Sequence, residues 1–168
     1  MYQILAESEP PGIAAIISTS WDAPDSVRMK GIPYICRQYR DIDYDAPGSF
    51  SDTDAEAFAS FVHCVSSDTN AKFLYVCCDA ATSRSPAVYA SIAKMWKFDF
   101  AEYIFRNPLF SPNMLVFQKL ASALGVPLSD EECDKLFYLS RKAFKDIIAK
   151  VKLQRVLAER NVHMDSAL

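Results

Sequence analysis

The 168-residue chain lacks several features that assign proteins to common functional classes. It has no excess of positive charge, because 18 Lys and Arg against 21 Asp and Glu give a net charge of −3. Bulk attraction to nucleic acid or to an anionic membrane is therefore not expected. No apolar run approaches the length of a membrane span, and the first residues lack the basic-then-apolar pattern of a signal peptide. Any anion-binding site must be local, and we expect a cytoplasmic protein.

The cysteines and histidines form no recognisable framework either. The five cysteines, at positions 36, 64, 77, 78 and 133, form no CxxC pair and no even disulfide set. Neither His63 nor His163 stands in a metal-ligand pattern with Cys or Asp. The simplest interpretation is a protein with free thiols in a reducing cytoplasm, without a metal or a cofactor.

Strand and helix patterns alternate through the first two thirds of the chain. Short apolar stretches bounded by turn residues predict strands at residues 2–8, 12–21, 31–41 and 72–78. Helices are predicted after the third strand, with Ser51 or Asp52 as N-cap, and from Ser85 onward. This alternation predicts an α/β fold with a mostly parallel central sheet of about four to five strands and helices on both faces.

The last third of the chain is predicted to be helical. One helical pattern covers residues 111–125, and a second opens with the capping-box pair Ser129 and Glu132. We find no internal repeat, low-complexity tract or linker. We therefore predict one domain over residues 1–168, with an α/β core over about 1–125 and a helical extension over about 126–168.

The loop after the strand at 72–78 has a composition that suits an anion site. The residues between Cys78 and Arg84 have small or polar side chains; they are Asp79, Ala80, Ala81, Thr82 and Ser83. A loop that leaves a buried strand and enters a helix directs backbone amides and the helix N-terminus toward one point, which favours an anion. An arginine at the helix start can bind two phosphate oxygens.

The same positive surroundings favour the thiolate form of Cys78. A thiolate beneath a bound phosphate is positioned for in-line attack, which gives a phosphocysteine intermediate. Ser85 can donate a hydrogen bond to that thiolate when it leaves in the second step.

The stretch CDAATSRSPAVYA at 78–90 resembles the cysteine-dependent protein tyrosine phosphatase superfamily, whose signature is Cys-x5-Arg followed by Ser or Thr. It is most similar to the compact dual-specificity-like branch, and in particular to a small bacterial tyrosine-phosphatase-like family. Two further stretches agree: RDI at 40–42, and SPNMLVFQKLASALG at 111–125. The resemblance covers about residues 13–125 and implies a hydrolase of phosphomonoesters that needs no metal.

The resemblance also implies roles for single residues. Cys78 would be the nucleophile, Arg84 would bind the phosphate and the transition state, and Asn113 would support the loop. The phosphate-binding residues would be Asp79, Ala80, Ala81, Thr82, Ser83, Arg84 and Ser85. The implied substrate is a phosphorylated protein or a small phosphomonoester, with phosphate, vanadate or sulfate as anions of the same site.

The family takes its general acid from a loop before the cysteine, where this chain has three candidates. The RDI match favours Asp41, whereas the distance in sequence from Cys78 favours Asp43 or Asp45. The alternation of side chains along a strand does not separate the three, because they share one phase. A solvated acidic turn without a catalytic role is the alternative.

Two positions depart from the family pattern. Cys77 stands where the family commonly has His, and Ala81 stands where a Gly is usual because the backbone there adopts a conformation that a Cβ disfavours. These departures leave a second hypothesis open, a pseudophosphatase that binds phosphorylated ligands without turnover. A third is a Cys-based arsenate reductase or rhodanese-like enzyme, and a lesser possibility is that Cys77 or Cys36 traps an oxidised Cys78 as a disulfide.

Overall fold

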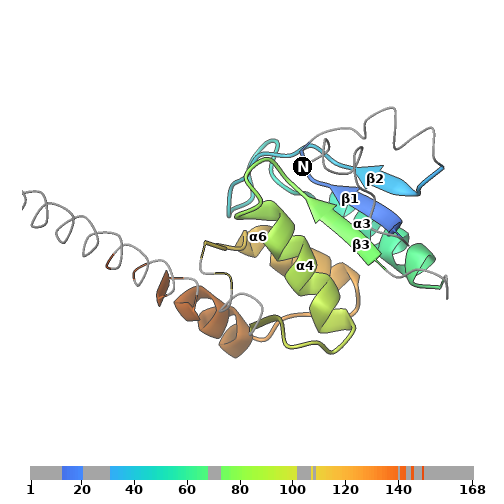
Figure 1. The fold of residues 1–168 in the computed structure, drawn as a ribbon. Helices are drawn as coiled ribbons and strands as arrows, with labels where there is room; N and C mark the ends of the chain where they lie inside the picture. Colours follow the sequence, from blue (N-terminus) through green and yellow to red (C-terminus); the bar gives the residue numbers. More distant parts are fainter. Residues whose placement is uncertain are drawn as a thin grey trace, which may run out of the picture.

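A computed structural model describes residues 13–20, 31–67, 73–101, 107, 109–139, 141–142, 145 and 149 of the chain. The bounded elements are β1 (Ile13–Ser18), β2 (Tyr34–Cys36), α3 (Asp52–Ser66), β3 (Phe73–Cys77), α4 (Arg84–Met95) and α6 (Met114–Ala123) (Figure 1). Residues 130–139 are also helical. The predicted mixture of strands and helices is confirmed.

The described strands form one parallel sheet of three strands in the order β2-β1-β3. β1 is the central strand, and its residue Ile16 pairs with Tyr34 on one side and with Tyr75 on the other. The strand predicted at residues 2–8 lies outside the described residues. A sheet of four to five strands is therefore not what the described part of the chain contains.

The strand predicted to run from Gly31 to about Asp41 is shorter than expected. β2 ends at Cys36, and the N–H of Arg37 makes one further hydrogen bond to the Ser18 carbonyl (3.0 Å). The neighbouring strand β1 ends at Ser18, so the chain beyond Arg37 has no strand edge to pair with there. It turns into a loop instead, in which the Arg40 N–H donates to the Gly48 carbonyl (2.7 Å).

The described helices pack against one face of the sheet. Ile17 and Val76 from that face meet Phe58 of α3, Val88 of α4 and Phe117 of α6 in a single buried core. The other face presents a smaller group, Ile16, Ile32, Tyr34, Tyr75 and Cys77. No helix within the described ranges covers this second face, so helices on both faces are not shown.

The helical residues 130–139 join the same core. Leu136 is buried among the core residues of α3, α4 and α6. An ion pair between Lys94 at the end of α4 and Glu132 adds a polar contact to the packing. The start of the predicted helical extension is thus packed on the α/β core.

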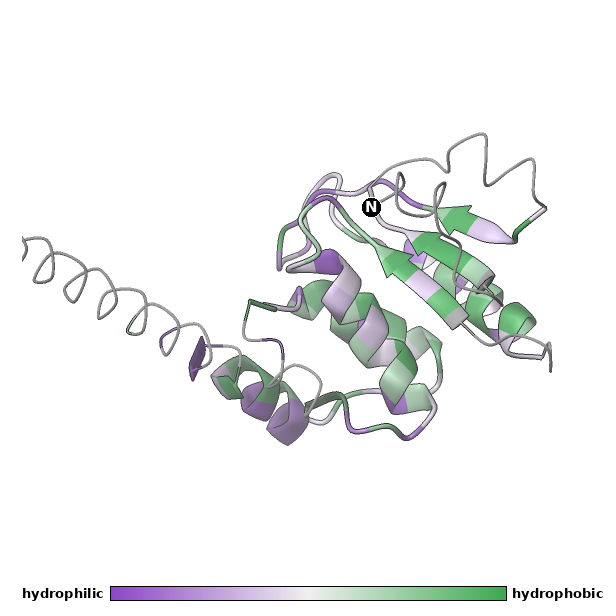
Figure 2. Cartoon of the chain, in the orientation of Figure 1, coloured by the Kyte–Doolittle hydropathy of each residue, from purple (hydrophilic) through white to green (hydrophobic). Residues whose placement is uncertain are grey.

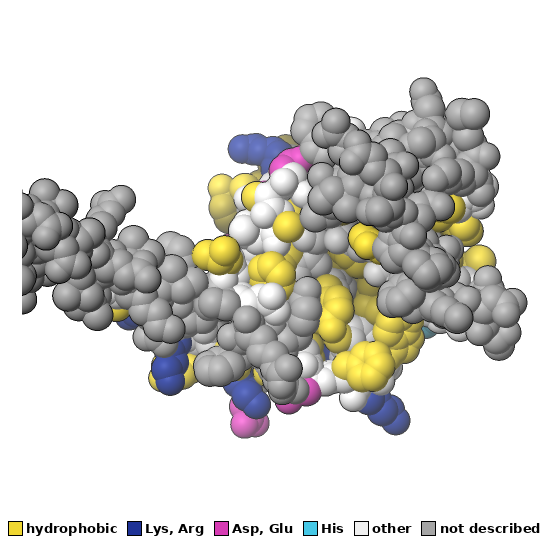
Figure 3. Space-filling view, in the orientation of Figure 1, with side chains coloured by type: hydrophobic (Ala, Val, Ile, Leu, Met, Phe, Trp, Pro, Cys, Tyr) yellow, Lys and Arg dark blue, Asp and Glu magenta, His cyan; other side chains and the backbone are white. Residues whose placement is uncertain are grey.

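The hydropathy of the chain follows this arrangement. Hydrophobic residues lie along the strands and on the packed helix faces, and the start of α4 is hydrophilic (Figure 2). The Lys and Arg side chains of the described residues are scattered along the edges of the view in Figure 3, and these side chains form no continuous basic surface there. None of the helices described is both long and apolar enough to cross a membrane.

Candidate functional site

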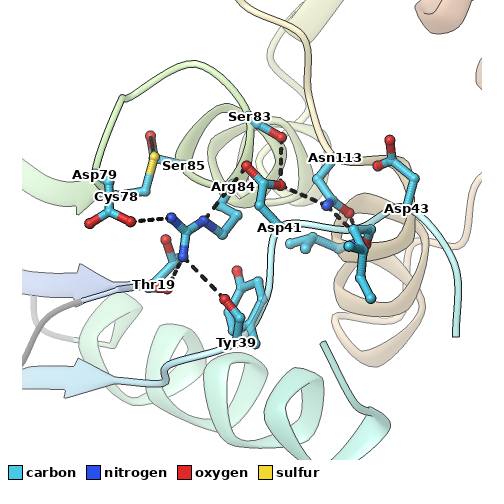
Figure 4. Close-up of polar contacts among 12 residues, drawn as sticks. Thr19, Tyr39, Asp41, Asp43, Cys78, Asp79, Ser83, Arg84, Ser85 and Asn113 are labelled. Carbon is cyan, nitrogen blue, oxygen red and sulfur yellow. Dashed lines mark hydrogen bonds and ion pairs between the residues drawn. The ribbon is translucent and has the colours of Figure 1, made fainter. Parts of the chain in front are cut away.

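The two adjacent cysteines lie at the C-terminal end of β3, where side chains alternate between the two faces of the sheet. The Cys77 thiol is buried on the second face with Ile16, and it donates a hydrogen bond to the Ile17 carbonyl (3.6 Å). Cys78 follows in the opposite phase and lies beside Ser85 at the start of α4 (Figure 4). The alternation therefore separates the two thiols.

Cys78 is held in the loop that connects β3 to α4. Its Sγ lies 3.2 Å from the Ser85 Oγ, and both side chains are buried. Ser85 and the following Pro86 and Ala87 form the first buried turn of α4, which fixes the hydroxyl next to the sulfur. The pair is in position for the serine hydroxyl to donate to a thiolate.

The loop carbonyls are bound from outside by the segment before α6. The N–H of Ser111 donates to the Thr82 carbonyl (2.7 Å), and the N–H of Asn113 donates to the Ser83 carbonyl (3.2 Å). In a planar trans peptide, the N–H points away from the carbonyl. The amides of Ser83 and Arg84 therefore point away from residues 111–113, toward the inside of the loop.

Ala81 has the backbone conformation that the sequence pattern led us to expect. Its φ is +54°, in the left-handed region where a Cβ is unfavourable. Such a conformation costs on the order of 1 kcal/mol in a residue other than glycine. The loop keeps the shape expected of a glycine at this position although the side chain is present.

Arg84 is the first residue of α4, and its side chain lies at the centre of the site, with 11% of its area exposed. Nη1 donates to the backbone carbonyls of Thr19 (3.0 Å) and Tyr39 (3.1 Å), which follow β1 and β2 (Figure 4). Nη2 pairs with Asp79, and Nε faces Asp41. Nη1 thus ties the guanidinium to the ends of β1 and β2, and the other two nitrogens face the carboxylates of Asp79 and Asp41.

Asp41 is the candidate acid that lies in the site. Its Oδ1 accepts hydrogen bonds from the Ser83 hydroxyl (2.8 Å) and from the Asn113 side-chain amide (2.9 Å). Its Oδ2 lies 3.8 Å from the Arg84 Nε, and the side chain is 39% exposed. Two hydrogen bonds therefore hold Oδ1 in place, whereas Oδ2 lies beside Arg84 on a partly exposed side chain.

Asp43 and Asp45 have other partners. Asp43 accepts from the backbone N–H of Met114 at the start of α6 (3.0 Å). Asp45 pairs with Lys119 (2.6 Å), and this hydrogen bond raises the pKa of Lys119. Both carboxylates lie along α6, so of the three candidates Asp41 alone is in contact with Arg84 and Ser83.

Asn113 connects the two loops of the site. Its side-chain oxygen caps α6 by accepting from the Val116 N–H (3.0 Å), and its side-chain amide donates to Asp41 and to the Ile42 carbonyl (3.1 Å). Its backbone N–H binds the Ser83 carbonyl. The residue is almost fully buried, so its side chain and its backbone together connect the loop after β2 with the loop after β3.

Asp79 lies on the side of Arg84 that faces the loop. Its carboxylate pairs with Nη2 at 2.5 Å, and its side chain is 44% exposed. A carboxylate on a guanidinium edge occupies positions that two oxygens of a phosphate would take. Asp79 therefore competes with any anion for this edge of Arg84.

Sequence reasoning missed Thr19 and Tyr39. Thr19 follows β1, and its hydroxyl donates to the Cys77 carbonyl (3.2 Å). Tyr39 follows β2 and is buried in the core with Phe50. The signal that points to them is topological: the carboxyl ends of neighbouring parallel strands meet at one edge of the sheet, where ligands of α/β proteins commonly bind.

The described residues contain no group of three or more His, Cys, Asp and Glu side chains arranged to hold a metal ion. No model of a known protein family matches the chain, and no curated protein is significantly similar to it in sequence.

Proposed function

We propose that the protein is a phosphomonoester hydrolase of the cysteine-dependent protein tyrosine phosphatase superfamily, acting on phosphotyrosine or on several phosphorylated residues. The observation that carries the proposal is the convergence of three parts of the chain on one loop. Cys78 and Ser85 lie 3.2 Å apart, Arg84 presents Nε and Nη2, and Asp41 is anchored to the loop by Ser83. Nucleophile, anion ligand and acid are the three groups that phosphoryl transfer through a covalent intermediate requires.

In the first step, the Cys78 thiolate attacks phosphorus in line with the ester oxygen. The S–P bond forms as the P–O bond to the leaving group breaks, and the departing oxygen takes the proton from Asp41. Arg84 and the amides of the loop hold the three other phosphate oxygens, whose charge they stabilise in the transition state. The products are a phosphocysteine and the dephosphorylated alcohol or phenol.

In the second step, water attacks the phosphocysteine and gives one proton to the Asp41 carboxylate. The S–P bond breaks, and inorganic phosphate leaves. The sulfur departs as a thiolate, which the Ser85 hydroxyl stabilises by donating a hydrogen bond over the 3.2 Å that separates them. Asp41 is protonated again, and the site is ready for another substrate.

The proposal includes two finer expectations about the whole chain. We expect four to five strands in the central sheet, because the pattern of residues 2–8 predicts a strand in addition to β1, β2 and β3. The protein works in a reducing compartment such as the cytoplasm, because a nucleophilic Cys78 must stay reduced.

The test is hydrolysis of a phosphotyrosine peptide and of p-nitrophenyl phosphate in the presence of a metal chelator. We expect turnover by the native chain and a loss of at least about 10⁴-fold in Cys78→Ser, since a serine hydroxyl is a far weaker nucleophile than the thiolate that attacks in the first step. Cys77→Ser is the matched control, because that thiol lies on the other face of the sheet, and it should retain turnover. Turnover that survives Cys78→Ser would overturn the proposal.

A second candidate function is supported by the contacts of Arg84. Asp79 already pairs with Nη2, and Ala81 holds a strained φ of +54°. These features fit a pseudophosphatase that binds phosphorylated ligands without turning them over. It would be favoured by phosphate binding without hydrolysis in the native chain and by hydrolysis that appears in the double variant Cys77→His with Ala81→Gly.

A further inference from the structure

The Tyr39 hydroxyl is a buried polar group that the proposed reaction does not use. The side chain is only 8% exposed, and its hydroxyl has no hydrogen-bond partner within the described part of the chain. Figure 4 shows this hydroxyl directed toward Arg84. The ring packs in the core against Phe50, with ring centroids 4.7 Å apart, and this contact fixes the direction of the hydroxyl. A buried hydroxyl without a partner destabilises the empty protein.

A second unpaired donor lies beside it. The Arg84 Nε is also buried without a hydrogen-bond partner in the described residues. The Asp41 Oδ2 lies 3.8 Å from it, which is too far for a hydrogen bond. The guanidinium carbon lies 6.0 Å from the centre of the Tyr39 ring. The Tyr39 hydroxyl and the Arg84 Nε are thus two neighbouring buried donors, and both lack a hydrogen-bond acceptor among the described residues.

The groups around Tyr39 identify the kind of acceptor that fits. The Thr19 hydroxyl beside it donates its proton to the Cys77 carbonyl. Burial raises the pKa of Tyr39, an effect that the positive charge of Arg84 and the neighbouring Thr19 side chain only partly oppose. The phenol therefore stays protonated and serves as a donor. An oxygen that carries negative charge is the acceptor that satisfies both the phenol and the Arg84 Nε.

We propose that the Tyr39 hydroxyl is a direct ligand of the bound phosphate group and shares one of its oxygens with the Arg84 Nε. This inference rests on the proposed phosphate site and adds to it a ligand that comes from outside the loop. Asp79 offsets part of the charge of Arg84, and the loop 78–85 contains no lysine. A neutral donor strengthens the binding of phosphate without adding positive charge, which suits substrates whose only strong anion is one phosphate monoester.

The experiment compares the native chain with Tyr39→Phe and with Tyr44→Phe, a control in the same loop whose side chain is 66% exposed. Dissociation constants for inorganic phosphate and for orthovanadate are measured by calorimetry well below the melting temperatures. Melting temperatures are measured without any anion. We expect Tyr39→Phe to weaken the binding of both anions about tenfold, as for a hydrogen bond to a charged group. Its melting temperature without anion should be equal or higher, because an unpaired hydroxyl is removed.

Each other result overturns the inference in a distinguishable way. Equal affinity in Tyr39→Phe and the native chain would remove Tyr39 from the site and leave the proposed function intact. A lower melting temperature without anion would mean that the hydroxyl already has a partner in the empty protein, such as Thr19. A weakening of the same size in Tyr44→Phe would mean that the loop as a whole, and not the Tyr39 hydroxyl, governs binding. Failure of the native chain to bind either anion would overturn the inference together with the proposed function.

Discussion

The N-termini of α3 and α4 both begin with a serine N-cap, and they differ in what that serine binds. At α3, the Ser51 hydroxyl accepts from the Asp54 N–H (3.2 Å), and the Asp54 carboxylate accepts in return from the Ser51 N–H (3.1 Å). At α4, the Ser83 hydroxyl makes no capping bond and donates to Asp41 instead. We call the start of α3 closed, because side chains of its own first turn cap it, and the start of α4 open, because no described side chain caps it.

The two helices also differ in the charge of their first turns. α3 has Asp52 and Asp54 in its first turn, which complement the positive end of the helix dipole. α4 has no acidic residue there and begins with Arg84. The positive end of the α4 dipole thus has no acidic side chain in its own first turn, and the N-cap hydroxyl binds Asp41 instead of a backbone amide. A helix start of this kind suits the anion site that we propose.

The remaining described helix starts resemble α3. Asn113 caps α6 through its side-chain oxygen. Ser129 and Glu132 form a capping box at the helical residues 130–139. Among the described helices with an assigned cap, α4 is therefore the exception, and the exception coincides with the Cys78 loop.

The largest effect on kcat/KM is expected from replacing Asp41, the candidate acid that the N-cap Ser83 of α4 binds. Asp41→Asn should lower kcat/KM on a phosphotyrosine peptide roughly 10²- to 10³-fold, because the leaving oxygen loses its proton donor. The matched control is Asp45→Asn, which loses a contact to Lys119 on α6 and should change kcat/KM by less than about twofold. Equal losses in the two variants would contradict the assignment of Asp41.

The two N-cap serines provide a direct test of the comparison. Ser83→Ala should lower kcat/KM about tenfold, since Asp41 loses one of the two donors to its Oδ1, and should leave stability nearly unchanged. Ser51→Ala should destabilise the fold by about 1 kcal/mol and leave kcat/KM unchanged. Steady-state kinetics and urea denaturation on both variants decide the matter. A loss of stability in Ser83→Ala as large as that in Ser51→Ala would mean that α4 is capped in solution.

A smaller effect is expected from the carboxylate that competes for Arg84. Asp79→Asn should tighten phosphate binding about fivefold, as for a partly exposed ion pair, and the gain should shrink at high salt. Calorimetric titration with phosphate at two salt concentrations measures it. Asp134→Asn, which removes an exposed charge elsewhere, is the control for net charge. Weaker phosphate binding in Asp79→Asn would mean that Asp79 supports the loop more than it obstructs the anion.

The smallest effect concerns the closed start of the helix at 130–139. The hydrogen bond from Lys94, together with the Ser129 N–H, lowers the pKa of Glu132 below its ordinary value of 4.5. A lowered carboxyl pKa stabilises the fold above that ordinary value, and the contribution is lost as the pH falls through the folded-state pKa. Glu132→Gln should therefore cost about half a kcal/mol near pH 7, with the difference from the native chain vanishing in acid.

Urea denaturation across this pH range measures the difference. Glu131→Gln, at an exposed position of the same turn, is the control and should show no such pH dependence. A difference that persists unchanged in acid would contradict the role of the Glu132 charge.

Local patterns were sufficient for several features of the fold. The continuous apolar run before Cys78 predicted β3, and the pair Ser51 or Asp52 predicted the start of α3, where Ser51 is the N-cap. Burial and capping could be predicted because they act between residues close in sequence. The prediction for β2 was too long, because its end depends on where β1 ends, which is information from a different part of the chain. The strand predicted at 2–8 lies outside the described residues.

The contacts of the candidate acids depended on the tertiary structure. Alternation gave Asp41, Asp43 and Asp45 the same phase, so the pattern alone left them equivalent. Their contacts differ because Ser83 and Asn113, 42 and 72 residues further along the chain, bind Asp41. No spacing rule connects residues at such separations.

The positions of Cys78 and Arg84 at the two ends of a short loop, between a buried strand and a helix, follow from the sequence. Five residues lie between them, and this number limits the distance that the chain can span. Tertiary structure alone decided that Asp41 and Tyr39 lie against Arg84, since packing brought the end of β2 beside the start of α4. It also decided that the α4 N-cap serine binds Asp41 and leaves the helix start open. A hydroxyl forms its bond with whichever partner the fold brings within reach.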